Sequence, residues 1–467
     1  MEFWKETLGS PVNIVAPMVD ASELPWRVLS RRYGAQLCYT PMLHSAIFCK
    51  DPKYRNEALV SCKEDKPLIV QFCGNDPKIL LEASLLAQEH CCAIDINLGC
   101  PQAIAKRGHY GSFLQDEWTL LFDIVNMLSK NLKIPVTCKV RRFESIEKTV
   151  RYAEMLESAG CKMLTVHGRT REQKGPLTGL ADWSYVKAVR EAVKIPVISN
   201  GNIQCLQDIM RCLEETGAVA VMTAEGNLYN PALFKSENPP AWKPALEYLE
   251  LIDMYPCPLS YIRGHLFKLF QHLLSIPSNN SIRIRLGAAN TMEQFKVIVN
   301  ELKDMYTPYH EGFKKWEETT EHDSQNLILP PWLCQSYVRD TPENHIKKVE
   351  EQRKDFAVNT NSDNKRHYED AEGNPISRKK MKKLRRISRR PEKIINMSEK
   401  SMEKCTVCVN PLGSKCIYKL CKKCCKNKCY IENLDCAGHR ILVKTRRAMA
   451  KLYASQRKIP EKLLDIL

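Results

Sequence analysis

One cysteine stands in a setting that favours acid chemistry. Cys100 lies between Gly99 and Pro101, directly after an apolar run that ends at Leu98. A single cysteine is more often buried and inert, but this one follows a strand-like segment and has hydrogen-bonding residues around it. Because a thiol is largely protonated at neutral pH, it can donate a proton. We therefore interpret Cys100 as a candidate general acid.

Polar residues at the ends of other apolar runs suit a planar ligand with polar edges. Lys139 lies at the end of one such run. A cation there can contact an electron-rich ring or an anion, such as the N1–C2 edge of a reduced flavin; an internal salt bridge is the alternative. Gln71 and Asn97 can fix the edges of a ring by hydrogen bonds. These three residues indicate a ring-binding site.

Two glycine-containing turns favour a phosphate group. Asn200-Gly201-Asn202 and Ala224-Glu225-Gly226 each follow a strand-like run. Glycine lets backbone N–H groups approach phosphate oxygens and direct a helix N-terminus at them. An isolated Asn-Gly-Asn usually marks only a turn, but its place after the seventh of eight such runs favours ligand binding.

These residues need a scaffold that brings the ends of many strands together. Short apolar runs alternate with amphipathic segments of helical length between residues 12 and 234. The alternation predicts an α/β fold, a (β/α)8 TIM barrel, whose active residues gather at the C-terminal ends of its strands. An open doubly wound sheet is the alternative, but it needs a glycine-rich first turn, and Pro17-Met18-Val19-Asp20 is not one. The predicted strands are 13–17, 36–40, 67–72, 93–98, 135–140, 163–167, 196–199 and 219–223.

The chain beyond the barrel changes character twice. Helical periodicity without strands over 240–320 predicts a small helical domain. Apolar content then falls, and residues 378–390 hold nine basic residues in thirteen, which predicts a basic, disordered linker that grips phosphate or directs nuclear import. A mixed aromatic and basic cluster at helical spacing, half of which we expect in the core, consists of Tyr261, Arg263, His265 and Lys268.

The composition favours a polyanionic partner. The formal net charge is +16, and nucleic acid is the first partner to consider for a basic protein. The first ten residues contain no apolar stretch and the longest apolar runs are strand-sized, so we expect no secretory signal and no membrane span. The 21 cysteines then predict reduced thiols in the cytoplasm, with the nucleus left open.

The last cysteines form a separate group with metal-ligand spacing. Their pattern is C-x2-C-x7-C-x4-C-x2-C-C-x10-C-x2-H, and eight S and N ligands are what two tetrahedral zinc ions need. Disulfides are the alternative, which a reducing compartment disfavours. Nearby lysines suggest RNA, with protein binding left open, and the spacing leaves open which ligands share an ion. The predicted ligands are Cys405, Cys408, Cys416, Cys421, Cys424, Cys425, Cys436 and His439.

The barrel segments together resemble a known family. DINLGCPQAIAKRGHYGSFL at 95–114, TCKVR at 137–141, LTVHGRTREQ at 164–173 and VISNGNI at 197–203 are similar to the tRNA-dihydrouridine synthase (Dus) family in order and spacing. The phrases APMVDASELPWR at 16–27 and QLCYTPMLH at 36–44 resemble the eukaryotic subfamily that acts on positions 16 and 17 of the tRNA D-loop. The resemblance covers about half the chain.

The resemblance implies a cofactor, a reaction and a set of contacts. NADPH or NADH would reduce FMN, hydride would pass from flavin N5 to C6 of a uridine pulled out of tRNA, and Cys100 would protonate C5. The implied FMN contacts are Pro17, Met18, Val19, Gln71, Lys139, His167, Asn200, Gly201, Asn202, Ala224 and Glu225. The implied substrate contacts are Asn97, Lys106, Arg107, Arg141, Arg169 and Arg171.

One turn departs from the family pattern. Many members have Gly-Arg where this chain has Ala224-Glu225, and the arginine helps to hold the FMN phosphate. A glutamate is wrong for a phosphate contact, so Gly226 or neighbouring amides would have to carry that role.

The resulting prediction is a tRNA-modifying monomer. Its expected parts are a barrel at 1–238, a helical tRNA-binding domain at 239–340, the linker at 341–400, the zinc module at 401–445 and a helical tail at 446–467. Two other functions stay open. One is an FMN barrel reductase of free pyrimidines, but such an enzyme does not need a basic tail. The other is a tRNA-binding protein with an inactive barrel, but the intact Cys100, Lys139 and His167 argue against it.

Overall fold

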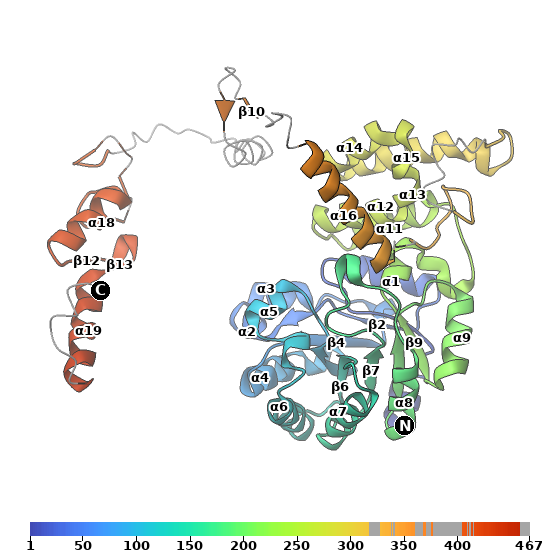
Figure 1. Cartoon of the computed structure of the whole chain (residues 1–467), viewed down its shortest axis with the longest axis horizontal. Helices are drawn as coiled ribbons and strands as arrows, with labels where there is room; N and C mark the ends of the chain where they lie inside the picture. Colours follow the sequence, from blue (N-terminus) through green and yellow to red (C-terminus); the bar gives the residue numbers. More distant parts are fainter. Residues whose placement is uncertain are drawn as a thin grey trace. The chain divides into compact units, whose positions relative to one another are not determined.

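The computed structural model describes two compact units, residues 1–361 and 362–467 (Figure 1). Within them the described residues are 1–316, 327–337, 339, 341–359, 368–369, 375–376, 404–408, 410, 412–413 and 415–457. The basic run at 378–390 lies outside the described residues, so its predicted role stays a prediction.

Parallel strands close into a barrel in the first unit. Each of the eight barrel strands pairs with its neighbours in the order β2-β1-β9-β8-β7-β6-β5-β4, and β2 pairs with β4 to close the ring. All six residues of β4 and of β5 are buried, because barrel strands have side chains inside and helices outside. The predicted (β/α)8 barrel is therefore confirmed. Its strands are β1 (Asn13–Val15), β2 (Leu37–Tyr39), β4 (Leu68–Cys73), β5 (Ala93–Leu98), β6 (Val136–Arg141), β7 (Leu164–His167), β8 (Val197–Asn200) and β9 (Ala220–Thr223), and the short β3 (Leu43–His44) pairs with β4.

Helices surround the strands in Figure 1. Local signals fix their ends: the Asp76 carboxylate accepts hydrogen bonds from the first backbone amides of α4, and Gly217 ends α9 in the left-handed conformation. The barrel helices are α1 (Leu24–Arg32), α2 (Ser45–Lys50), α3 (Pro52–Ala58), α4 (Pro77–Ala87), α5 (Ala103–Gly108), α6 (Trp118–Asn131), α7 (Ile146–Ser158), α8 (Ser184–Ala192), α9 (Leu206–Thr216) and α10 (Glu225–Tyr229).

A helical region follows the barrel, as predicted. It shares one apolar core with α1, so it is packed on the barrel. It includes two short helices, α13 and α14, between the longer helices α12 and α15. The helices are α11 (Trp242–Met254), α12 (Leu259–Leu269), α13 (Gln271–Ser275), α14 (Asn280–Ala288) and α15 (Met292–His310).

A buried polar cluster joins α1 to this region. The Glu23 carboxylate lies 3.0 Å from His265 Nε2 and accepts a 2.5 Å hydrogen bond from the Tyr248 hydroxyl. The Trp26 ring stacks on His265 with 3.9 Å between centroids. Burial raises the pKa of Glu23, but the His265 charge and the two hydrogen bonds outweigh it and hold that pKa below its usual range. His265 is therefore a core residue, as we expected for half of its helix cluster.

The predicted linker begins with a helix. Helix α16 (Pro342–Asn359) occupies residues where we predicted disorder. Its start has the sequence of a helix N-terminus: the Thr341 hydroxyl accepts a hydrogen bond from the backbone amide of Asn344, and Pro342 occupies the first turn. Pro342 also lies against Gly179 of the barrel, so tertiary packing supports the helix.

The second unit is small and rich in cysteine. Its described elements are the antiparallel pairs β10 (Tyr368–Glu369) with β11 (Pro375–Ile376) and β12 (Asp435–Cys436) with β13 (Ile441–Leu442), and the helices α18 (Lys422–Ile431) and α19 (Val443–Arg457). Its described core consists mostly of cysteines, with Leu420 and Val443 as the fully buried aliphatic residues. In the described part of the chain, no helix combines the length and apolar character that a membrane span requires.

Candidate active site and metal centre

A chain of hydrogen bonds orders the mouth of the barrel between β4 and β6. Asn97 Nδ2 donates to Gln71 Oε1 at 2.8 Å, and Gln71 Nε2 donates to Asp95 Oδ2 at 2.8 Å. Asp95 also accepts from the Thr137 hydroxyl at 2.6 Å, and its burial raises the pKa of this carboxyl to about 6. The sequence prediction missed Asp95, although a charge inside the buried run AIDINL was a usable signal. The amides of Gln71 and Asn97 are thereby held in fixed orientations.

The same asparagine positions the loop of the candidate acid. Asn97 Oδ1 accepts from the backbone amides of Cys100 at 3.0 Å and Gly99 at 3.3 Å. The Cys100 carbonyl accepts from the Ser112 amide at 3.1 Å and the Ser112 hydroxyl at 3.0 Å. Gly111 packs so closely that a Cβ atom there would lie 2.8 Å from the Cys100 carbonyl oxygen. The half-buried Cys100 thiol is therefore presented from a fixed backbone.

Lys139 places a positive charge in the interior of the mouth. Lys139 Nζ donates to Asn200 Oδ1 at 2.8 Å, and Lys139 is the register partner of Asn97 on the neighbouring strand. Burial lowers the pKa of Lys139 to about 8, and the Arg141 charge contributes, while Asp95 and Cys100 act in the opposite direction. A poorly solvated ammonium of this kind favours an anionic or electron-rich ligand.

Two predicted substrate contacts, Arg141 and Arg169, donate hydrogen bonds to carbonyls of the loop after β7. Arg141 Nη1 donates to the carbonyls of Thr170 at 2.6 Å and Gln173 at 2.9 Å. The Arg141 Nε atom is buried and has no hydrogen-bond partner among the described residues. Burial, followed by the charge of Arg169, lowers the pKa of Arg141 to about 10. Arg141 therefore supports the site and still has a donor that a ligand could satisfy.

Arg169 is fully engaged with the protein around it. Its guanidinium donates to the Gly179 carbonyl at 2.9 and 3.1 Å and to Asn202 Oδ1 at 2.9 Å. Arg169 Nη1 lies 3.0 Å from His167 Nε2, and because a guanidinium only donates, this histidine nitrogen accepts and the ring proton is on Nδ1. Burial, with the charges of Lys139, Arg141 and Arg169, lowers the pKa of His167 well below its usual range. A neutral imidazole with one N–H donor results.

The remaining predicted tRNA contacts lie on the rim. Lys106 and Arg107 are exposed on α5, close in sequence to the Cys100 loop. Arg171 is half-buried and pairs with Asp116 at 3.3 Å and with Glu172 at 3.1 Å. Lys106 and Arg107 are thus the most accessible of the predicted basic contacts, and their role toward tRNA stays a prediction.

The two glycine-containing turns meet at one end of the mouth. Gly201 has φ +115°, and a Cβ atom there would lie 2.6 Å from Ala181 Cβ, so only glycine fits. The Thr223 hydroxyl at the end of β9 donates to the Ile203 carbonyl at 2.8 Å. The loop after β8 and the turn after β9 are therefore in direct contact, as a shared phosphate site requires.

Glu225, the residue that departs from the family pattern, has an ion-pair partner. Arg339 binds it through two hydrogen bonds, Nε to Oε2 at 3.0 Å and Nη2 to Oε1. No local pattern could have indicated this pair, because its members are 114 residues apart.

The opening segment of the barrel has an accessible apolar side chain. Pro17 and Met18 are half-buried, and Val19 is 52% exposed. The Met18 amide donates to the Ser22 hydroxyl at 2.7 Å, which fixes the backbone of this turn. The segment can therefore offer backbone groups and an apolar face, as predicted.

The donors of the mouth fit FMN. The half-buried Lys139 ammonium suits an electron-rich ring, and the two turns that meet beside Gly201 suit a phosphate.

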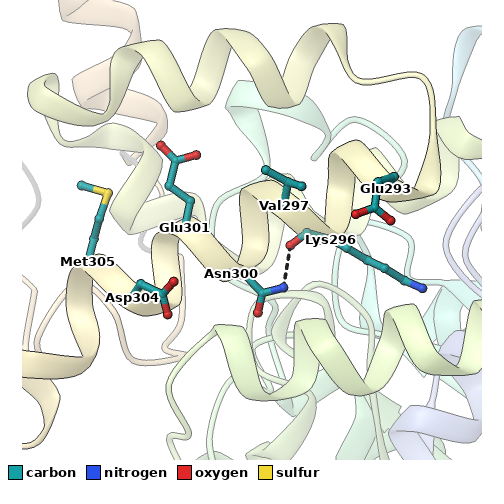
Figure 2. A pocket seen from close by; sticks show the side chains of 7 residues that line it. All are labelled: Glu293, Lys296, Val297, Asn300, Glu301, Asp304 and Met305. Atoms are coloured by element: carbon teal, nitrogen blue, oxygen red, sulfur yellow. Dashed lines mark hydrogen bonds between the residues drawn. The ribbon is translucent and has the colours of Figure 1, made fainter.

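An acidic hollow elsewhere in the first unit has a different character. Figure 2 shows it along one face of α15, where its lining includes Glu293, Glu301 and Asp304. Two of its charges are already paired, Glu301 with Arg285 and Lys296 with Asp253. An acidic, open surface of this kind does not suit a polyanion.

The cysteine-rich module brings all eight predicted metal ligands into two groups. The ligand atoms of each group lie within 4.8 Å of one another, and Cys408 Sγ is 3.6 Å from Cys421 Sγ and 3.5 Å from Cys424 Sγ. Tetrahedral Zn–S bonds of about 2.3 Å place sulfurs about 3.8 Å apart, so the geometry suits zinc. The groups are Cys405, Cys408, Cys421 and Cys424, and Cys416, Cys425, Cys436 and His439.

The closed parallel barrel has at its mouth a positioned thiol, a half-buried ammonium and two turns suited to a phosphate, a combination that fits an oxidoreductase. Residues 14–313 match the dihydrouridine synthase (Dus) family, and the chain belongs to this family, as its motifs predicted.

Several relatives are similar over most of the chain. The mouse protein "tRNA-dihydrouridine(16/17) synthase [NAD(P)(+)]-like" is 50% identical over 448 residues, which cover 95% of this chain and 91% of the relative. The Saccharomyces cerevisiae protein "tRNA-dihydrouridine(16/17) synthase [NAD(P)(+)]" is 43% identical, over 72% of this chain and 85% of its own length. The human "tRNA-dihydrouridine(20a/20b) synthase [NAD(P)+]-like" is 32% identical, over 64% and 92%.

Proposed function

We propose that this protein is an FMN- and NAD(P)H-dependent tRNA-dihydrouridine synthase that reduces uridines 16 and 17 of the D-loop. Membership of the family and the 50% identity to the mouse relative with that name support the assignment. The observation that carries it is the Cys100 loop, held at the mouth by Asn97 beside the half-buried Lys139. Reduction of a C5=C6 bond adds a hydride at C6 and a proton at C5, and the positioned thiol can donate that proton.

The residues of the mouth then have defined tasks. Lys139 and the loop after β8 would hold the cofactor, which would supply hydride when it is bound. Asn97 and Gln71 orient polar ring edges by their fixed amides. Cys100 donates the proton to C5 of the flipped uracil, a base that must leave the folded tRNA to reach the thiol.

A direct assay tests the proposal. Purified full-length protein is incubated with NADPH and unmodified tRNA, and dihydrouridine is mapped by position; free uracil and uridine serve as competing substrates. We expect dihydrouridine at positions 16 and 17. Reduction of the free pyrimidine without any dihydrouridine in tRNA would instead favour a reductase of free pyrimidines.

We also propose that the cysteine-rich module binds two zinc ions, one in each ligand group. The groups interleave along the chain, since Cys416 lies between members of the other set. Neither ion can then be bound by one local segment, and metal would supply folding energy that the small apolar core does not. Zinc analysis of the purified protein should give two ions per chain, and Cys408→Ser should give one.

Cys429 provides a matched control for the metal sites. It is buried with its Sγ 3.9 Å from Cys425 Sγ, yet it belongs to neither group. Cys429→Ser should therefore keep two ions, and loss of an ion in this variant would contradict the grouping. We further propose that the protein acts as a monomer in the cytoplasm, with nuclear import by residues 378–390 open to a localisation assay.

A further inference from the structure

A strap, residues 327–337 with Arg339, runs from the helical region to the barrel mouth. Its first half is anchored in the helical region, where the buried Trp332 packs against Trp316 with 5.5 Å between ring centroids. The buried Cys334 donates its amide to the Pro239 carbonyl at 2.9 Å and accepts from Asn238 Nδ2 at 2.7 Å. The strap therefore leaves the helical region from a fixed point.

The second half of the strap contacts the two turns that meet at the barrel mouth. The Ser336 hydroxyl donates to the Gln204 carbonyl, in the loop after β8, at 3.2 Å. The Tyr337 ring stacks on Tyr229 of α10, with 5.3 Å between centroids and 16° between planes. These contacts place Arg339 beside the turn after β9.

Arg339 adds a positive charge at the turn after β9, where the barrel itself has the negatively charged Glu225. Glu225 directly follows Ala224, and its neighbour Gly226 packs so closely on the loop after β8 that a Cβ atom would lie 3.1 Å from Gln204 Cα. Glu225 alone would repel a phosphate. Arg339 pairs with it through Nε and Nη2, and the pair leaves the other guanidinium N–H groups unused by the carboxylate.

The local charges are coupled. Burial lowers the pKa of Arg169 to about 10, Glu225 opposes this effect and Arg339 adds to it. Arg339 is therefore close enough to influence a residue that itself binds Asn202 in the loop after β8. The Arg339 side chain is 46% exposed, so it can reach a ligand without displacing core residues.

We propose that Arg339 is a specificity-determining residue of the cofactor site: Glu225 orients its guanidinium, whose free N–H groups bind the phosphate of FMN. The inference rests on the proposed FMN site. A guanidinium fork matches phosphate geometry, and its planar donors lose little freedom when a carboxylate already holds them. The strap thereby supplies from a distant segment the cation that the turn after β9 lacks.

Binding of two flavins tests this assignment, because riboflavin lacks the phosphate. Flavin-free full-length protein is titrated with FMN and with riboflavin, and binding is followed by the quenching of flavin fluorescence. Arg339→Gln should weaken FMN binding about 10- to 100-fold, the range for hydrogen bonds to a charged group, and leave riboflavin binding within about twofold. The control is Arg285→Gln, which breaks the exposed Arg285–Glu301 pair in the helical region and should change neither affinity.

A double variant separates phosphate binding from simple charge neutralisation. If Arg339 contacts the phosphate, Glu225→Gln/Arg339→Gln regains only the part of the FMN affinity that repulsion by the unpaired Glu225 costs, and it stays less selective for FMN over riboflavin than the wild type. Recovery of wild-type FMN affinity in the double variant would overturn the assignment. So would an Arg339→Gln variant that binds FMN as the wild type does or that loses the same affinity for both flavins. A wild type that binds FMN no more tightly than riboflavin would also overturn it. Wild-type protein that binds neither flavin would contradict the FMN site itself, a distinct outcome.

Discussion

At the scale of single residues, the site combines a Cys100 backbone held by hydrogen bonds with a Lys139 ammonium whose pKa is lowered. The Cys100 loop is held on both sides, by Asn97 and by Ser112, so the thiol does not need to be ordered when substrate binds. Lys139 is charged in a setting that penalises its charge. The desolvation of the Lys139 charge costs free energy, which a bound anionic or electron-rich ligand would offset.

Cys100→Ala should lower the rate of dihydrouridine formation in tRNA about 10²- to 10⁴-fold, the usual contribution of a general acid. FMN binding should persist, because the Asn97 and Ser112 bonds are made by the backbone of residue 100. Single-turnover kinetics with tRNA measures the rate. Cys49→Ala, which removes another half-buried thiol from α2, is the control; equal rates for both variants would contradict the role of Cys100.

FMN affinity should fall as the pH rises through about 8, where Lys139 loses its charge. The fall cannot exceed about tenfold per pH unit for one proton. In Lys139→Arg the affinity should stay flat to about pH 9.5, because a guanidinium remains protonated. Fluorescence titrations with FMN between about pH 6.5 and 9.5 give both profiles, and parallel profiles would assign the pH dependence to another group.

The folding stability of the flavin-free protein should depend on pH in the opposite direction to the FMN affinity. The folded pKa of Lys139 lies below its ordinary value of 10.5, so the unfolded chain binds more protons between about 8 and 10.5. The contribution of this residue to stability therefore rises with pH over that interval.

At the scale of elements, the helical region is attached to the barrel by a buried ion pair and aromatic stacking. Glu23 precedes α1, while Tyr248 and His265 belong to α11 and α12. Met18, in the opening turn of the barrel, packs against the same apolar core as α1, α11 and α12. The joint and the strap are two separate attachments between the same regions.

His265→Ala should destabilise the first unit by about 3–5 kcal/mol, because it leaves the Glu23 carboxylate buried without its partner. The measurement is the melting temperature of the purified protein, followed by tryptophan fluorescence. Lys296→Ala breaks the exposed Lys296–Asp253 pair instead and should cost about 1 kcal/mol or less. Similar shifts for the two variants would show that the buried pair does not hold the joint.

At the scale of the whole molecule, the two compact units have different sources of stability. The first has extensive apolar cores inside and outside the barrel. The described core of the second consists mostly of cysteines with few aliphatic residues, and the two zinc ions proposed above would stabilise it. Reactions at the barrel and metal binding at the module should therefore be separable by experiment.

A zinc chelator should unfold the module and leave FMN bound to the first unit. Far-UV circular dichroism would report the loss of helix, and flavin absorbance would report the retained cofactor. The physical reason is that the ligand groups lie within residues 405–439, outside the unit that ends at residue 361. Release of FMN together with zinc would contradict this independence.

Removal of residues 362–467 should weaken tRNA binding and reduce its dependence on salt. The removed part contains the nine basic residues of 378–390. For each tRNA phosphate that the shortened protein no longer neutralises, the slope of log K against log salt should become shallower by about 0.7–0.9. Filter binding between about 50 and 300 mM salt compares the two proteins. Equal slopes would show that the first unit alone neutralises the phosphates.

Sequence patterns determined the barrel because each of its elements is local. Consecutive buried β-branched residues, helix-length amphipathic segments and strand-end polar groups are properties of neighbouring residues, and the family motifs fall on the strand ends that the structure brings together. The cysteine spacing likewise predicted eight ligands, all of which the two groups contain. The start of α16 is also encoded locally, in Thr341 and Pro342, although the low apolar content of the segment predicts disorder.

Tertiary structure alone decided which partners distant residues have. The basic residues Arg141 and Arg169 bond to neighbouring loops, His265 enters the core, and Arg339 reaches Glu225 across 114 positions. The division of the zinc ligands into interleaved sets is of the same kind. The physical reason is that periodicity reports which face of an element is buried, whereas the pairing of charges and ligands depends on how separate elements pack in space.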